Sequence, residues 1–212
     1  MKRFGWSCLL IVVAFAILSG CSDGDGNEPS GDDDIADDDL YPEPDYRDAE
    51  APDVSERGPF EVGNRTYIWV DESRWDPVTN GPRTLMVEVW YPAAPEAADM
   101  PYDIVKNFCP DWWDSYVRPT LEEEYGAPPE ELDNFDKPTG SHRDAPADYL
   151  HAPYPLLIFS HGFGGVRIQN FTMSEWLASW GFVVVAPDHT GNALVVCFPD
   201  GIVELNPDIR LI

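Results

Sequence analysis

Hydrophobic and polar positions alternate along parts of this chain, and the alternation predicts strands. Residues 83–91 (RTLMVEVWY) give the stronger strand pattern, with Glu88 on the face opposite the apolar one. The apolar face of this strand carries Leu85, Val87, Val89 and Tyr91. Residues 65–70 (RTYIWV) alternate in the same way, and the turn-rich segment 76–82 (DPVTNGP) separates the two. The pattern therefore predicts an antiparallel hairpin, in which Pro92 ends the second strand.

A second block, residues 156–192, predicts one strand–helix–strand crossover. Residues 156–160 and 182–186 are continuous apolar runs, which are typical of strands buried on both faces of a parallel sheet. Between them, the T-x-x-E pattern of residues 172–175 predicts a capping box at the start of a helix, and Gly181 follows the end of that helix. We expect its apolar face to carry Trp176, Leu177 and Trp180. These elements indicate an α/β fold.

Residues 96–150 show no regular period and are rich in proline, acidic and aromatic residues. We expect short helices around residues 101–108, 111–124 and 128–134. An irregular connection of this length is either an insertion that packs its aromatic side chains on the domain or a lid over a binding site. The sequence leaves both alternatives open.

The first 21 residues have the features of an export signal. Lys2 and Arg3 precede an apolar segment, Cys8–Ile17, that is short for a membrane span. It ends in Leu-Ser-Gly-Cys, which resembles a bacterial lipobox, with Cys21 as the acylated residue. An ordinary secretory signal or an uncleaved anchor is the alternative. The lipobox predicts a protein anchored by lipid to the bacterial cell envelope, at the outer membrane or cell surface.

Charge divides the rest of the chain, whose formal net charge is −26. Residues 22–57 are dominated by Asp and Glu, with Arg47 as the single base between residues 22 and 56, and predict a disordered linker. The folded domain is expected at residues 58–212. This large negative charge argues against a nucleic-acid partner, because binding to phosphates needs Lys and Arg. The acidic residues after Asp23 do not follow the calcium-loop pattern, because the glycine and glutamate that it needs are absent.

Five segments give the chain a family resemblance. The segments VGNRTYIWVDESR and NGPRTLMVEVWYPA, then HRDAPAD, YPLLIFSHGFGG and WGFVVVAPDHTGN, resemble the platelet-activating-factor acetylhydrolase-like (isoform II) branch of the α/β-hydrolases. This branch is related to dienelactone hydrolases and to polyester-hydrolysing cutinases. The resemblance covers roughly residues 62–212 and is interrupted by the 96–150 segment, within which HRDAPAD is the part that matches. It implies the N-terminal part of an α/β-hydrolase fold, with a mostly parallel sheet after an antiparallel hairpin.

The same resemblance assigns roles in the glycine-rich turn. The backbone N–H of Phe163 would be an oxyanion-hole donor, and Gly162 and Gly164 would let the loop approach the substrate. His161 would support the loop through backbone hydrogen bonds, with general base as the alternative role. A glycine turn of a generic crossover is the alternative for the whole motif. Asp188 and His189, which follow the next strand, are expected to orient a loop.

The residues that would complete an esterase are not found in this sequence. No serine or cysteine has the G-x-S-x-G context of a nucleophile elbow, and the family places its triad in the order Ser, acid, His. We therefore expect the triad after Ile212, a C-terminally truncated chain, and no esterase activity from this chain alone. Residues 206–212 predict the first turn of a further helix. The strand at residues 182–186 would then lack one neighbour.

Three classes of function remain open at this point. The first is a serine-type ester or phospholipid hydrolase held on a membrane through Cys21. The second is a non-catalytic surface lipoprotein, and the third is a polyester or cutin hydrolase. No cofactor is expected, because no His, Cys and carboxylate residues have zinc-site spacing. Cys109 and Cys197 are either a disulfide or two buried thiols, and we expect His142 and His151 to be exposed.

Overall fold

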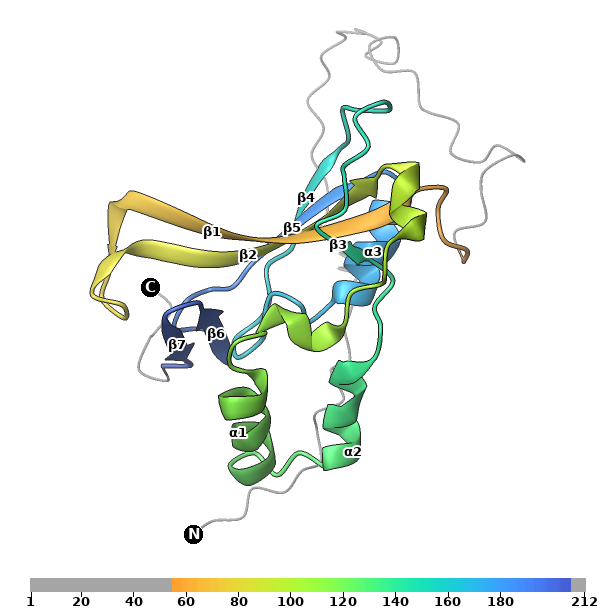
Figure 1. Ribbon diagram of the computed structural model, residues 1–212. Helices are drawn as coiled ribbons and strands as arrows, with labels where there is room; N and C mark the ends of the chain where they lie inside the picture. The colour runs from red at the N-terminus through yellow and green to blue at the C-terminus, as the bar shows by residue number, and fades with distance from the viewer. Residues whose placement is uncertain (1–54, 207–212) are drawn as a thin grey trace, which may run out of the picture. The chain divides into compact units, whose positions relative to one another are not determined.

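The computed structural model describes residues 55–206, which contain a five-stranded mixed sheet and a separate two-stranded hairpin (Figure 1). In spatial order the sheet contains β3 (His142–Arg143), β1 (Glu61–Asp76), β2 (Gly81–Ala93), β5 (Val183–Pro187) and β4 (Leu156–Ile158). The β1–β2 and β2–β5 pairs are antiparallel, and the β1–β3 and β4–β5 pairs are parallel. The hairpin consists of β6 (Val195–Phe198) and β7 (Gly201–Glu204). The predicted α/β class is confirmed.

The predicted antiparallel hairpin is confirmed, and both of its strands extend beyond the alternating residues, 65–70 and 83–91, that predicted it. The register pairs Tyr67 with Val87 and shifts between Asp71 and Trp75, where β1 is irregular. The apolar face of β2 is buried as predicted, in a cluster that contains Val87, Val89, Tyr91 and Val185. The prediction that Pro92 ends β2 is wrong, because the strand continues to Ala93. Pro92 lies opposite Val62, and its carbonyl accepts a hydrogen bond of 2.9 Å from the backbone of Asp148.

The predicted crossover is also confirmed, as β4, α3 (Phe171–Ser179) and β5. The full burial predicted for its first strand is wrong, because Leu156 is 63% and Ile158 is 67% exposed. In the described part of the chain, β4 is an edge strand that pairs with β5 alone. The expectation that the 182–186 strand lacks a neighbour is wrong as well. That strand, β5, lies between β2 and β4, so the unpaired edge belongs to β4.

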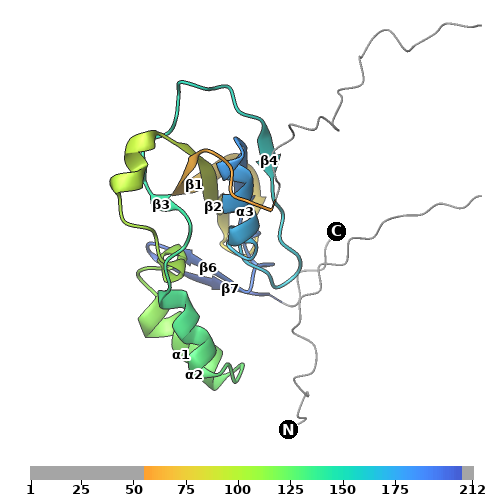
Figure 2. The same cartoon turned by 90° about the vertical axis from the view of Figure 1, so that its right-hand side faces the viewer.

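Helix α3 lies against the sheet, in contact with β1, β2 and β5 (Figure 2). The capping box is not formed, because the N-cap residue is Asn170 and the helix already begins at Phe171. The Glu175 carboxylate instead accepts hydrogen bonds of 3.0 Å from the backbone of Gly140 and 2.9 Å from Ser141 Oγ. The predicted apolar face is partly right: Leu177 packs against the main core, but the buried residues of the helix are Ser174, Glu175, Ala178 and Ser179. Gly181 follows the helix with a φ of +90°, as a C-terminal glycine should.

The irregular segment 96–150 folds into short helical pieces, as predicted. They are η2 (Pro95–Asp99), η3 (Val105–Phe108), η4 (Trp113–Val117), α1 (Arg118–Glu123), α2 (Pro129–Leu132) and η5 (Asp133–Asp136). Phe108 and Trp113 are buried in the main apolar core, where Trp113 stacks on Phe135 with ring centroids 4.4 Å apart. Several aromatic side chains of the insertion therefore pack on the domain, whereas Tyr102, Tyr125 and Tyr149 are exposed.

A network of buried charges lies on the face of β2 opposite its apolar cluster. Glu88 is fully buried and accepts hydrogen bonds from Asn64, at 2.9 Å, and from Arg143, at 3.0 Å. The Arg143 guanidinium also binds Asp103 at 2.7 Å, and Arg167 Nε lies 3.5 Å from the Glu88 carboxylate. This network connects β2 to the irregular segment and to the loop that follows β4.

Several predictions fall on residues that the structure does not describe, 1–54 and 207–212. They are the export signal with Cys21, almost all of the acidic linker, and the predicted final helix. Within residues 55–206, no helix has the length and apolar character needed to cross a membrane.

Candidate functional site

The glycine motif forms a tight turn directly after β4. The N–H of Gly165 donates a 2.9 Å hydrogen bond to the carbonyl of Gly162, which closes a four-residue turn. Gly164 occupies the third position with a φ of +73°. A type II turn requires a positive φ at this position, so a glycine is needed there.

A second turn of the same kind follows β5 and packs against the first. The N–H of Asn192 donates a 2.7 Å hydrogen bond to His189 O, and Gly191, in the third position, has a φ of +81°. Two backbone hydrogen bonds join the turns, Gly164 N–H to Asn192 O at 3.0 Å and Leu194 N–H to Gly165 O at 3.1 Å. Parallel strands β4 and β5 end side by side, and this brings both turns to one edge of the sheet.

The peptide group between Gly162 and Phe163 is held in one orientation. Its carbonyl accepts the Gly165 N–H and also lies 2.8 Å from His161 Nδ1. Because the backbone of His189 donates to His161 Nε2 at 3.0 Å, the proton of a neutral His161 ring must be on Nδ1, which therefore donates to Gly162 O. In a trans peptide the N–H points away from the carbonyl. The Phe163 N–H is thus directed away from these contacts and has no hydrogen-bond partner among the described residues.

A depression of about 520 Å³ lies beside this N–H group. Phe163, which is 61% exposed, lines the depression together with His189 and Asn192. Arg83 and Asp76 line it as well, and their ion pair measures 3.1 Å from Nη1 to Oδ2. The depression therefore lies at the turn that carries the unpaired donor, and its lining combines apolar surface with several polar side chains. Such a site can bind the oxygen of a polarised carbonyl group.

The structure also shows a serine–histidine contact that the sequence analysis missed. Ser160 Oγ lies 2.7 Å from His189 Nε2, and Ser160 is exposed. No carboxylate among the described residues is hydrogen-bonded to Nδ1 of His189, and Ser160 does not lie on a strand-to-helix elbow. The pair therefore lacks the third member and the geometry of a catalytic triad. A usable signal was that both residues follow the ends of adjacent parallel strands.

The environment of His189 favours the neutral form of its imidazole. Burial lowers the pKa of this ring from 6.5, the electrostatic effects of the neighbouring His161 and Arg83 lower it further, and Asp188 opposes them. An unfolded chain would therefore take up a proton at residue 189 before the folded one, so this residue reduces stability as the pH falls below about 6.5.

In an NMR titration of the complete protein, we expect the midpoint of His189 protonation to lie below pH 6.5. The His189→Asn variant should lose less stability than the wild type between pH 7 and pH 5. A His189 midpoint at or above 6.5 would contradict this assignment of its environment.

The other predicted residues are distributed over the fold. Cys109 and Cys197 form a disulfide, with Cα atoms 5.5 Å apart. The predicted exposure of His142 is wrong, because this ring is 1% exposed and stacks on Tyr102. His151 is exposed as expected and pairs with Asp148 at 2.7 Å. Within residues 55–206, no three His, Cys, Asp or Glu side chains are grouped as metal ligands.

Two comparisons with known proteins found matches, which concern the family and the fold. Residues 142–199 match the family "Platelet-activating factor acetylhydrolase, isoform II". The fold is similar to a solved structure of a ferulic acid esterase from Streptomyces cinnamoneus, with a TM-score of 0.57 and 30% sequence identity. That match covers 74% of this chain and 43% of the esterase chain, so the present chain spans less than half of its length. The comparison with curated proteins gave no match. The chain therefore carries part of an α/β-hydrolase fold, and its residues 142–199 match the platelet-activating factor acetylhydrolase isoform II family.

Proposed function

We propose that this chain forms the oxyanion-loop half of a serine-type carboxylic-ester hydrolase. The observation that carries the proposal is the Phe163 N–H, which is unpaired within the described region while the opposite side of its peptide group is held by Gly165 and His161. A donor fixed in this way can stabilise the oxyanion of a tetrahedral intermediate without reorganising during the reaction. His161 and the two flanking glycines, Gly162 and Gly164, hold the loop in shape.

The nucleophile, the acid and the base of this proposed enzyme come from a segment after Ile212. Two facts support that location: the sequence contains no G-x-S-x-G elbow, and the chain spans 43% of the ferulic acid esterase. The exposed apolar edge of β4 fits the same proposal, since a further strand would cover it. On this basis the 212-residue chain alone has no esterase turnover.

The Phe163→Pro variant tests the oxyanion donor in the complete protein. Proline has no N–H, yet it is favoured at the second position of a type II turn, so the turn should be retained. We expect kcat to fall by about 10²–10³, as when an oxyanion donor is removed elsewhere. Phe163→Ala is the matched control, because it removes the ring and keeps the N–H. A Phe163→Pro enzyme with the kcat of Phe163→Ala and an unchanged Tm would overturn the proposed role.

The proposed substrate is a short-chain ester or a phospholipid with a short acyl group, as in the family that matches residues 142–199. Polyester hydrolysis and a non-catalytic surface role are the alternatives, and the ferulic acid esterase adds feruloyl esters as a class to test. The complete protein should be assayed on a p-nitrophenyl ester, a short-acyl phospholipid, a feruloyl ester and a polyester film. Absence of turnover on all four would favour the non-catalytic role.

The location that we propose is the bacterial cell envelope, with the protein anchored through acylated Cys21. The lipobox-like sequence supports the anchor, and the Cys109–Cys197 disulfide is typical of proteins outside the reducing cytosol. Metabolic labelling with a fatty-acid analogue should label the wild type and not Cys21→Ala. Equal labelling of both would exclude acylation at this residue.

A further inference from the structure

Asn192 has an unusual position in the candidate site. Asn192 is 8% exposed and lines the depression beside Phe163. Its backbone is fully engaged, since the N–H donates to His189 O and the carbonyl accepts from Gly164 N–H. Its side-chain Nδ2, by contrast, is buried without a hydrogen-bond partner among the described residues. A buried unpaired donor lowers the stability of a protein by about 1–3 kcal/mol, so such groups are rare in native structures and call for an explanation.

The fixed backbone of Asn192 limits where its amide group can reach. Its carbonyl is bonded to Gly164, the residue that follows Phe163, so the Asn192 side chain starts next to the turn that carries the unpaired Phe163 N–H. The oxygen and nitrogen of an asparagine amide are nearly isosteric, and a half-turn about χ2 exchanges them. A ligand atom that accepts hydrogen bonds in the depression would therefore select the orientation in which the NH₂ group faces it.

Neighbouring polar side chains do not compete for this role. Thr190 donates its hydroxyl to Thr84 O at 2.7 Å, and Ser160 is paired with His189 at 2.7 Å. Arg83 is paired with Asp76. Among these side chains Asn192 is the one with a donor that is both buried and without a partner, and the ligand chemistry that it fits is a carbonyl oxygen that gains negative charge.

We propose that the side-chain amide of Asn192 is an additional hydrogen-bond donor to the carbonyl oxygen of the ester substrate, alongside the Phe163 N–H. This inference rests on the proposed function, because it concerns the same site and the same reaction. No proton is transferred by Asn192, since the amide only donates a hydrogen bond that strengthens as the oxygen becomes anionic.

The Asn192→Leu variant of the complete protein tests the proposal. Leucine is similar in size and has no donor. We expect kcat to fall by about 10²–10³, as for the loss of one oxyanion donor, with KM changed much less. The Tm should be equal or higher, because an unpaired buried donor has been removed. If Asn192 were merely structural, its replacement would lower Tm and leave kcat within a few fold.

Thr190→Val is the matched comparison, since it removes the hydroxyl that is bonded to Thr84 O. It should lower Tm and reduce kcat much less than Asn192→Leu does. Asn192→Gln, which keeps an amide, should retain more kcat than Asn192→Leu. If the wild type is active and Asn192→Leu keeps its kcat, the inference fails while the proposed function stands. If the wild type hydrolyses no ester, both fail.

Discussion

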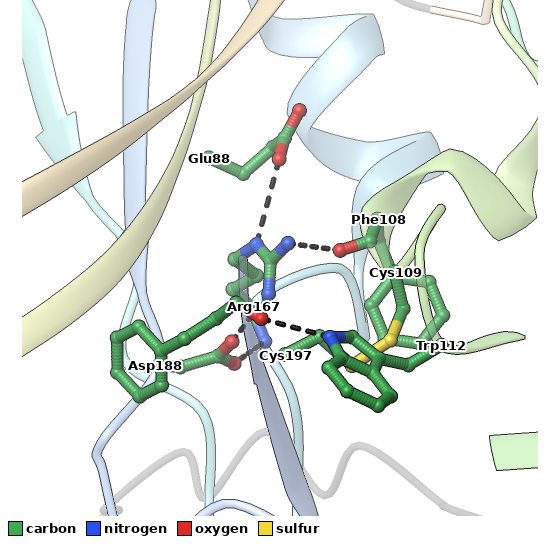
Figure 3. The surroundings of a disulfide bond; sticks show 8 residues. Glu88, Phe108, Cys109, Trp112, Arg167, Asp188 and Cys197 are labelled. Carbon is green, nitrogen blue, oxygen red and sulfur yellow. Dashed lines mark hydrogen bonds and ion pairs between the residues drawn. A yellow bond between two sulfur atoms is a disulfide. The ribbon is translucent and has the colours of Figure 1, made fainter. Parts of the chain in front are cut away.

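Replacing Asp188 by alanine should lower the free energy of unfolding of the complete protein by about 3–5 kcal/mol. Asp188 and Arg167 both have fully buried side chains, and their ion pair measures 2.5 Å. Asp188 also accepts a hydrogen bond from the backbone N–H of Arg167, so one carboxylate binds the residue twice (Figure 3). The variant would leave the guanidinium buried with a distant partner, Glu88, at 3.5 Å and with the carbonyl of Phe108. Urea unfolding would measure the loss.

Two comparison variants make this prediction specific. Asp136 pairs with Lys106 on the surface, where its side chain is 48% exposed, so Asp136→Ala should change stability little. The double variant Arg167→Met/Asp188→Leu should be less destabilised than the sum of the two single variants, because neither charge is left alone. A loss below about 1 kcal/mol for Asp188→Ala would show that Arg167 finds another counter-ion or reaches water.

The local elements of this fold could be predicted from the sequence, because short-range pattern decides them. The alternation around Val87 specifies a strand with one apolar face, and the apolar runs on either side of α3 specify adjacent parallel strands. Gly181 marks a helix end for the same local reason. The glycine turn around Phe163 was placed correctly after β4 because a strand, a glycine cluster and a helix follow one another within a few residues.

The long-range contacts could not be predicted in this way. Alternation places Glu88 opposite Val87, which suggests exposure to solvent, yet Glu88 is fully buried. Its partners Arg143 and Arg167 are 55 and 79 residues away, so no local pattern connects them. The capping box failed for a related reason, since Glu175 binds Gly140, which is 35 residues away. Tertiary contacts therefore decided which charges are buried.

The candidate site shows the same division. The sequence identified the turn that contains Phe163, because its glycines are contiguous. It did not identify Asn192 as part of the site, because the contact between the turns is a backbone hydrogen bond from Gly164 to Asn192 O. The Ser160–His189 contact also spans 29 residues. Pairs of turns at the ends of adjacent parallel strands are the signal that would find such contacts.

Removing the disulfide should be the second large change in stability. Cys109 and Cys197 are 88 residues apart in the sequence, so their bond closes a long loop between the irregular segment and β6. Cross-links of this length stabilise mainly by restricting the unfolded chain, and their loss typically costs about 2–5 kcal/mol. Without the disulfide, the folded state should keep its local geometry around the two cysteine positions. Trp112 Nε1 donates to Phe198 O at 2.8 Å and Arg167 donates to Phe108 O, and each of these bonds lies next to one cysteine (Figure 3).

The double variant Cys109→Ala/Cys197→Ala of the complete protein tests this prediction. Its free energy of unfolding should fall by about 2–5 kcal/mol, and a reducing agent should lower the wild type to nearly the same value while leaving the variant unchanged. Because the neighbouring hydrogen bonds remain, the near-ultraviolet circular dichroism of the folded variant should stay close to that of the reduced wild type. Reactive thiols at Cys109 and Cys197 in the oxidised, denatured wild type would show that the bond does not form. A variant as stable as the wild type would instead mean that the unfolded chain is already restricted by residual structure.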